Sequence, residues 1–436
     1  MTRGVMARRP VLFVALLAAA TLAGLGLFFQ TTGQVQFGLM IDAGSTGSRM
    51  HTFKFLRRNG KMELLNEDFL PIKPGLSSYK DEPEKAGASL RPLLERSKNL
   101  VPPHLRASTP VYLRATAGLR MTGEETAEKI LASARRELKS SGFMVRDKWV
   151  SILGGNDEGI YSWITVNYLL SKQATSTVGT LEMGGGSAQI AFVPSALSDA
   201  ASVGKSGSPA GCEEPPAEVV EFMGENLRLY TTSHLGYGIK KAKATMMEHF
   251  KDAGLADANP CLSRGPQKVT VPFSSGEPLA MTGAGDFTAC ELEIDRIMGK
   301  DAGVCKCGVC TYGAKGQPHA IKEYVAIAFY VERTVDIGMK SPISLRELRA
   351  KGKEVCAMDV DEVAQKYPNV PNGAGTDLCF DLSFIHSHLH LGNGIPQDDD
   401  SVLIHVVNKI NGVELGWSLG AMFHELSLLD RERGKA

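Results

Sequence analysis

Residues 37–49 read FGLMIDAGSTGSR, and residues 178–189 read VGTLEMGGGSAQ. Each stretch is an apolar run of strand length that ends in an acid and is followed by glycine and hydroxyl residues. Asp42 and Glu182 occupy the same place in the two patterns. A single Asp-x-Gly turn is common, so either stretch alone is weak evidence for a site. The pair indicates a duplicated α/β fold with one copy of the pattern in each half.

The residue types in these two stretches suit a metal bound to a phosphate chain. A carboxylate at the end of a strand can hold a divalent cation, directly or through water. Glycines allow backbone N–H groups to approach an anion, and Ser and Thr hydroxyls add further donors. Two such turns facing each other would bind a metal–phosphate chain from both sides. The alternative is that both are ordinary structural turns.

The rest of the chain supports an α/β assignment. Apolar runs of strand length occur at residues 37–41, 111–113, 150–153, 178–183 and 189–193, and helical periodicity occurs at 84–99 and 125–140. Residues 197–218 and 364–377 are rich in Gly, Ser, Ala, Pro or Asn and are predicted to be surface loops.

Glu158 is the best candidate for a catalytic base. It follows a strand, Gly154-Gly155 and a cap at Asn156 or Asp157, which places it in the first turn of a predicted helix. Hydrolysis of a phosphoanhydride needs a group that orients the attacking water. The alternative role is that of a first-turn acid that complements the helix dipole. Asp157 has the same ambiguity and ranks below Glu158.

Two further motifs contain glycine turns. In residues 112–120, YLRATAGLR, Thr116 could approach the metal–phosphate chain. Arg114 or Arg120 could balance phosphate charge, or either could form a surface salt bridge. In residues 414–421, ELGWSLGA, Trp417 lies between glycines, and a core position is its simplest interpretation.

Length and composition limit the possible classes of protein. The chain has 436 residues with 43% hydrophobic and 22% charged residues, which fits two globular domains. Lys+Arg and Asp+Glu are 48 each, so no nucleic-acid partner is expected. Residues 11–29 are uncharged and follow three arginines, so they form either a membrane anchor about 29 Å long or a cleaved signal peptide.

The cysteines indicate an oxidising compartment. All eight lie after residue 211, which makes the second half the disulfide-bonded half. The CKCGVC stretch at 305–310 resembles part of a zinc site, but it has no nearby Cys/His pair. Disulfides are therefore the preferred interpretation of this stretch.

The sequence resembles the apyrase family, the nucleoside triphosphate diphosphohydrolases, at five places. The matching stretches, in chain order, are DAGSTGSR, YLRATAGLR, GGNDEGIYSWITVNYLL, LEMGGGSAQIAF and ELGWSLGA. KPGLSSY at 73–79 and SHLGYG at 233–238 add smaller matches. Together they extend over nearly all of the chain beyond residue 36.

The resemblance implies an actin-like fold of two ribonuclease-H-like domains with the site in the cleft between them. It implies removal of the terminal phosphate from nucleoside di- and triphosphates, dependent on Ca²⁺ or Mg²⁺. Glu158 matches the catalytic base, and Ser187 and Gln189 match residues that hold the water. The other matching positions are Asp42 and Glu182 for the metal through water; Ser45, Thr46, Gly47, Ser48, Thr116, Gly185 and Gly186 for phosphate; and Cys261–Cys290 and Cys356–Cys379 for disulfides.

Three positions qualify the resemblance. Glu182 stands where most members have Asp, which keeps the charge but adds a methylene and could change the metal geometry. Phe329 and Tyr330 are candidates for stacking on the base, with core packing as the alternative. The preference among bases is left open.

From these observations we expect three parts. Residues 1–35 would form a cytoplasmic stub and anchor or signal peptide, residues 36–165 with 400–436 domain I, and residues 166–399 a disulfide-bonded domain II. The expected location is the secretory pathway, as a single-pass type II protein of the Golgi, endoplasmic reticulum or cell surface, or as a secreted enzyme. The alternatives are an actin-like kinase or polyphosphate phosphatase, and a nucleotide-binding protein with little turnover. The oligomeric state is not predicted.

Overall fold

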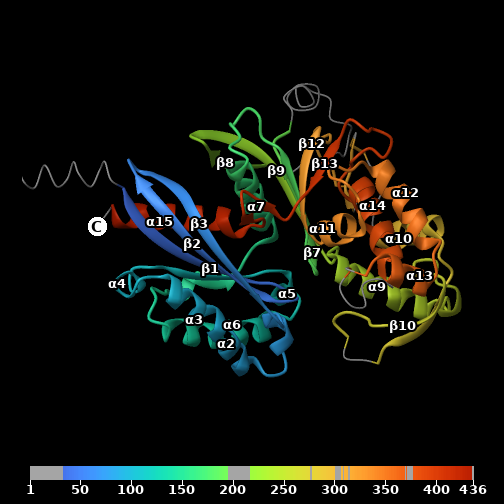
Figure 1. Ribbon diagram of the computed structural model, residues 1–436, viewed down its shortest axis with the longest axis horizontal. Coiled ribbons are helices and arrows are strands. Elements are labelled where there is room, and N and C mark those ends of the chain that lie inside the picture. The colour runs from blue at the N-terminus through green and yellow to red at the C-terminus, as the bar shows by residue number, and fades with distance from the viewer. Residues whose placement is uncertain are drawn as a thin grey trace, which may run out of the picture.

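The computed structural model describes residues 33–194, 217–274, 277–299, 306–307, 309–312, 315–368, 370 and 377–434, arranged as two lobes (Figure 1). The proposed anchor at 11–29 lies outside these residues, as does most of the predicted loop at 197–218. Within the described part, no helix is both long enough and apolar enough to span a membrane.

The first lobe is built on a five-stranded sheet in the order β3-β2-β1-β4-β5. Its antiparallel half contains β1 (Gln34–Ala43), β2 (Ser48–Arg58) and β3 (Lys61–Ile72). Its parallel half adds β4 (Val111–Ala115) and β5 (Val150–Ile152) beside β1. The strands predicted at 37–41, 111–113 and 150–153 are therefore confirmed.

The second lobe has a six-stranded sheet in the order β13-β12-β6-β7-β9-β8. Its strands are β6 (Gly179–Met183), β7 (Ser187–Phe192), β8 (Ala217–Phe222), β9 (Glu225–Leu235), β12 (Glu323–Ala328) and β13 (Leu403–Val406). β6, β7 and β9 run antiparallel, and β12 and β13 lie parallel to β6. Apart from the added edge strand β8, this order repeats that of the first sheet, so the predicted duplication is confirmed.

The domain boundaries stay a prediction. β13 lies within residues 400–436, which we assigned to domain I, yet it pairs with β12 in the second sheet. The apolar run LIHV is buried at alternate positions there.

The helix predicted at 84–99 is interrupted. It consists of η2 (Pro83–Lys85), α2 (Ala86–Ser89) and α3 (Arg91–Leu100). Pro92 lies in the first turn of α3, and proline cannot continue a preceding helix because it lacks an N–H and clashes with the carbonyl four residues back. The helix predicted at 125–140 is α6 (Glu124–Lys139), and with α3 it packs its apolar side chains on the first sheet.

Helices gather beside the second sheet in Figure 1. They include α9 (Ile239–Asp252), α10 (Phe287–Met298), α11 (Phe329–Thr334), α12 (Leu345–Cys356), α13 (Val360–Lys366) and α14 (Leu378–Ser387). The predicted disulfides Cys261–Cys290 and Cys356–Cys379 are both present. Cys307 and Cys310 of the CKCGVC stretch are also disulfide-bonded, which agrees with the disulfide interpretation of that stretch.

Two helices connect the lobes. α7 (Gly155–Leu169) follows β5 of the first sheet and packs against β7 and β9 of the second. α15 (Ser418–Arg433) follows the second sheet and packs against β1 of the first. The helices meet at Gly420, whose backbone N–H donates to the Thr165 hydroxyl at 2.9 Å. Trp417, before α15, is 2% exposed, which confirms its core position.

Candidate active site

The two glycine turns meet between the lobes. A Cβ atom added to Gly185 in the second turn would lie 2.6 Å from the Ser45 Oγ in the first turn. Each turn is also closed by a backbone hydrogen bond between residues three apart. Gly44 N–H donates to Gly47 O at 3.0 Å, and Gly184 N–H donates to Ser187 O at 2.9 Å. The fold therefore brings together two stretches that are far apart in the sequence.

A glycine from another segment supports each turn. A Cβ atom at Gly75 would overlap the carbonyl oxygen of Gly44, and one at Gly238 would overlap the backbone nitrogens of Gly186 and Ser187. Both positions thus require the close backbone approach that only glycine allows. The KPGLSSY and SHLGYG stretches supply these two glycines.

Glu158 lies in a hydrogen-bonded group at this junction. It is 6% exposed, and its Oε2 accepts from Arg120 Nη2 at 2.8 Å and from Gln189 Nε2 at 3.1 Å. Arg120 also donates to the Ser187 Oγ at 3.1 Å. Gln189 Nε2 lies 2.8 Å from the Ser187 Oγ and 3.0 Å from the Ser233 Oγ. The structure thus brings together the three residues predicted for catalysis.

The surroundings of Glu158 change its acidity. Burial, followed by the negative charge of Glu182, raises the pKa of Glu158 to about 8, and the positive charge of Arg120 opposes this rise. A carboxyl group with a pKa near neutrality is suited to accept a proton from water. This environment favours the role of catalytic base for Glu158 over that of an acid that complements the helix dipole, since such an acid would lie at the surface as an ionised group.

The two predicted metal acids have different partners. Asp42 Oδ2 accepts from Arg49 Nη1 at 3.0 Å, while its Oδ1 is buried without a hydrogen-bond partner. Glu182 accepts a short hydrogen bond from the Ser162 hydroxyl. Burial raises the pKa of Glu182 to about 7, against the lowering effect of Ser162.

These acids fit a cation held through water. No group of three or more His, Cys, Asp and Glu side chains within the described residues converges as a direct metal site. The unpartnered Asp42 Oδ1 is instead an acceptor available to a metal-bound water, and the Gln189 Oε1 is a second buried acceptor without a partner. A water molecule bound to a divalent cation would satisfy the Asp42 acceptor.

The predicted phosphate-binding residues surround the same junction. Thr46 Oγ1 accepts from Arg49 Nη2 at 3.4 Å, and the buried Ser48 Oγ has no hydrogen-bond partner. Thr116 is 7% exposed, and its N–H donates to the Ala43 carbonyl at 3.2 Å, which fixes it beside the first turn. A Cβ atom at Gly186 would lie 2.7 Å from the Met121 Cε, so the second turn contacts the first lobe as well.

The two aromatic candidates for base stacking differ in their exposure. Phe329 is partly exposed and lies with its ring centroid 5.8 Å from Lys240 Nζ. Tyr330 is 1% exposed and packs in the core of the second lobe. Base stacking by Tyr330 is therefore wrong and the core-packing alternative is right, because no face of its ring is open to a ligand.

The structure also resolves the choice between the two arginines and adds two serines. Arg120 enters the site, whereas Arg114 forms a short ion pair with Glu425 on α15. Ser162 and Ser233 contact site residues and were not predicted. Ser162 lies four residues after Glu158 on the same helix, and this i, i+4 spacing was the signal that could have identified it. Ser233 is the first residue of the SHLGYG stretch, whose resemblance to the family was the signal that could have identified it.

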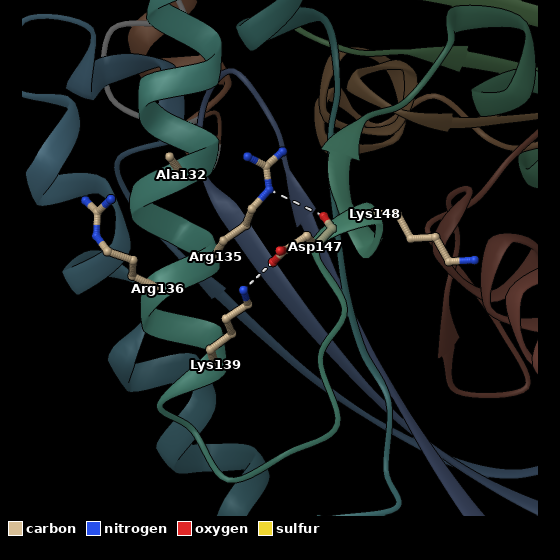
Figure 2. A pocket seen from close by; sticks show the side chains of 6 residues that line it. All are labelled: Ala132, Arg135, Arg136, Lys139, Asp147 and Lys148. Carbon is tan, nitrogen blue, oxygen red and sulfur yellow. Dashed lines mark hydrogen bonds and ion pairs between the residues drawn. The ribbon is translucent and has the colours of Figure 1, made fainter.

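A separate surface hollow of about 530 Å³ lies between α6 and the residues that lead into β5 (Figure 2). It is lined by Ala132, Arg135, Arg136, Lys139, Asp147 and Lys148. Lys139 pairs with Asp147 at 2.5 Å, and Arg135 reaches the Asp147 carbonyl. This hollow contains none of the predicted site residues, so we place the active site at the junction of the two turns.

Comparison with known proteins finds several similar nucleoside phosphatases. The chain is 34% identical to the guanosine-diphosphatase of Schizosaccharomyces pombe, covering 90% of this chain and 74% of that protein. It is 33% identical to ectonucleoside triphosphate diphosphohydrolase 5 of Gallus gallus, covering 90% and 88%. It is 31% identical to the Homo sapiens nucleoside diphosphate phosphatase ENTPD5, again covering 90% and 88%.

Among solved structures, a nucleoside triphosphate hydrolase from Neospora caninum superposes with a TM-score of 0.61 at 15% identity, covering 97% of this chain and 98% of that one. This likeness supports the predicted actin-like fold. The family model for the GDA1/CD39 nucleoside phosphatases matches residues 29–433. The duplicated sheets, the paired glycine turns and these matches together show that the chain belongs to the GDA1/CD39 nucleoside phosphatase family.

Proposed function

We propose that this chain hydrolyses the terminal phosphate of nucleoside di- and triphosphates by direct attack of water. The observation that carries the proposal is the buried Glu158, which accepts hydrogen bonds from Arg120 and Gln189 where the two glycine turns meet. The family membership supports the same class of reaction, because the relatives include a guanosine-diphosphatase and a nucleoside diphosphate phosphatase.

In the proposed reaction, the Glu158 carboxylate accepts a proton from a water molecule. The water oxygen forms a bond to the terminal phosphorus while the bond to the bridging oxygen breaks. The nucleotide shortened by one phosphate leaves with that electron pair. Gln189 and Ser187 orient the water through their free hydrogen-bonding capacity, and the positive charge of Arg120 favours the ionised form of Glu158.

Phosphate binding is assigned to the two turns. Backbone N–H groups and hydroxyls of residues 45–48 would bind the phosphate oxygens from one lobe, and residues 185–186 from the other. Thr116 adds a hydroxyl beside the first turn. Asp42 and Glu182 would hold Ca²⁺ or Mg²⁺ through water, and the cation would neutralise charge on the phosphate oxygens.

The substrate class and the compartment follow from the relatives and the disulfides. We propose nucleoside diphosphates as the preferred substrates, since two of the named relatives are diphosphatases. The Cys261–Cys290 and Cys356–Cys379 disulfides favour an oxidising compartment, so we propose the secretory pathway. Residues 11–29 would then serve as the anchor or signal sequence.

Release of orthophosphate by the purified full chain tests the proposal. GDP, UDP, ADP, GTP, ATP and GMP would each be offered with Ca²⁺, with Mg²⁺ or with EDTA. We expect release from the diphosphates and triphosphates, none from GMP, and loss of release with EDTA. Correctly disulfide-bonded protein that binds GDP but releases no phosphate would instead support the nucleotide-binding alternative.

A further inference from the structure

Four basic side chains, two from each lobe, lie close enough to one another for their charges to interact. Lys73 and Arg49 belong to the first lobe, and Lys240 and Arg333 to the second, and the charges of the other three act on Lys240. Arg49 is paired with Asp42, and Arg333 is paired with Asp381 and Glu332. Among the described residues, Lys73 and Lys240 form no ion pair.

Both lysines are held against the turns. The Lys240 Cδ lies 3.6 Å from the position of a Cβ atom at Gly185, and its Nζ lies 5.8 Å from the centroid of the Phe329 ring. The Lys73 Cγ lies 3.7 Å from the position of a Cβ atom at Gly47. One lysine side chain from each lobe, without an ion pair among the described residues, therefore lies beside the proposed phosphate site.

Different charges surround Glu158 and Lys240. Glu182 and Asp42 raise the pKa of Glu158 and Arg120 lowers it, whereas three of the four charges that act on Lys240 are positive. Burial, followed by the positive charge of Lys73, lowers the pKa of Lys240, and the negative charge of Glu332 only partly opposes this. An anionic ligand would remove the repulsion between the two lysines.

We propose that Lys73 and Lys240 bind the phosphate of the leaving group, which in a nucleoside diphosphate is the α-phosphate, and retain the nucleoside monophosphate after cleavage. This inference rests on the proposed hydrolysis. In phosphoryl transfer the leaving oxygen lies opposite the attacking water and gains negative charge as its bond to phosphorus breaks. Glu158 marks the water side, and the two lysines supply cationic donors on the other side. Phe329, next to Lys240, then lies where the nucleoside would emerge.

Product inhibition separates the two phosphate positions. Inhibition of GDP hydrolysis by GMP reports the leaving-group position, and inhibition by orthophosphate reports the terminal position. We expect Lys240→Ala and Lys73→Ala each to raise the inhibition constant of GMP about tenfold and to change that of orthophosphate less than about twofold. Lys240→Arg should restore GMP inhibition, because it keeps the charge. Lys251→Ala, an exposed lysine at the end of the same helix, is the matched control.

Calorimetric titration with GMP tests the site without turnover. If the alanine variants bind GMP and orthophosphate equally more weakly than the wild type, the inference is overturned, since the lysines would then bind the terminal phosphate. Inhibition by GMP that is unchanged in both alanine variants would overturn it as well. If the wild-type chain hydrolyses no nucleotide but loses GMP binding in the lysine variants, the proposed function fails and the anion site stands.

Discussion

The two sheets of this protein have the same strand order, yet they contribute different chemistry. In each, an acid near the end of the first strand is paired in register with a residue of the second strand, Asp42 with Arg49 and Glu182 with Gln189. In the first lobe this partner is a cation that binds the acid. In the second lobe the partner is an amide that turns to Glu158 instead, and the acid bonds to Ser162.

The connecting helices show the same asymmetry. α7 begins at the junction and presents the buried carboxylate of Glu158, whereas Trp417 at the start of α15 is buried in an apolar cluster. Duplication thus supplied two matching phosphate turns, each closed by a supporting glycine. The proposed catalytic base exists in one copy only. The comparison shows that the residues we propose for phosphate binding lie in the symmetric part, and the base we propose lies in the asymmetric part.

The strongest test of this division is Glu158→Gln. It should lower orthophosphate release from GDP by about a thousandfold or more, because an amide cannot accept a proton from water. Asp157→Asn is the matched control, since Asp157 is the neighbouring exposed acid and the lower-ranked base candidate. A larger loss in Asp157→Asn than in Glu158→Gln would show that the base has been misassigned.

The two register-matched acids should differ in the size of their effects. We expect Asp42→Asn to lower kcat/KM for GDP at least about a hundredfold and Glu182→Gln about tenfold, at a fixed Ca²⁺ concentration. Asp42 has a free carboxylate oxygen, whereas burial raises the pKa of Glu182 to about 7 and leaves part of it uncharged at neutral pH. Exposed Asp257→Asn is the control. Equal losses would mean that the two lobes hold the cation symmetrically.

Arg120 affects the pH at which Glu158 ionises. Because the base must be ionised and the pKa of Glu158 is about 8, kcat/KM should rise with pH through this region. Arg120→Gln removes the charge that favours the ionised form, so the rising limb should move about one pH unit higher. Arg114→Gln, which removes an arginine paired outside the site, should leave the limb in place. If the rising limb does not move in Arg120→Gln, the charge of Arg120 does not affect the pKa of Glu158.

The smallest effect is expected where the helices cross. A Cβ atom at Gly420 would overlap the backbone of Tyr161, whereas one at Gly416 would meet nothing within 4 Å. We expect Gly420→Ala to lower the free energy of unfolding by about 1–3 kcal/mol and Gly416→Ala to leave it nearly unchanged, measured by denaturant unfolding. Equal stability of the two variants would show that the crossing tolerates a wider separation of the helices.

The local sequence determined much of this protein. The apolar runs before Asp42 and Glu182 predicted the paired strands, and the glycines after them predicted the turns, because both signals depend on neighbouring residues. The position of Glu158 in a first helical turn was also predicted correctly, although the predicted cap was wrong: the N-cap is Gly154, not Asn156 or Asp157, and it makes no side-chain cap hydrogen bond. The resemblance then supplied the roles of Ser187 and Gln189, and both disulfide pairs that it implied are formed.

Only the tertiary structure decided which side chains meet. Arg114 and Arg120 belong to one short motif, yet one pairs with the C-terminal helix and the other with Glu158. Phe329 and Tyr330 are adjacent, yet one is partly exposed and the other is buried in the core. Burial, partners and pKa values depend on segments brought together by two sheets and two crossing helices. The sequence therefore predicted the two turns, and the packing of the lobes placed Glu158, Arg120, Lys73 and Lys240 around them.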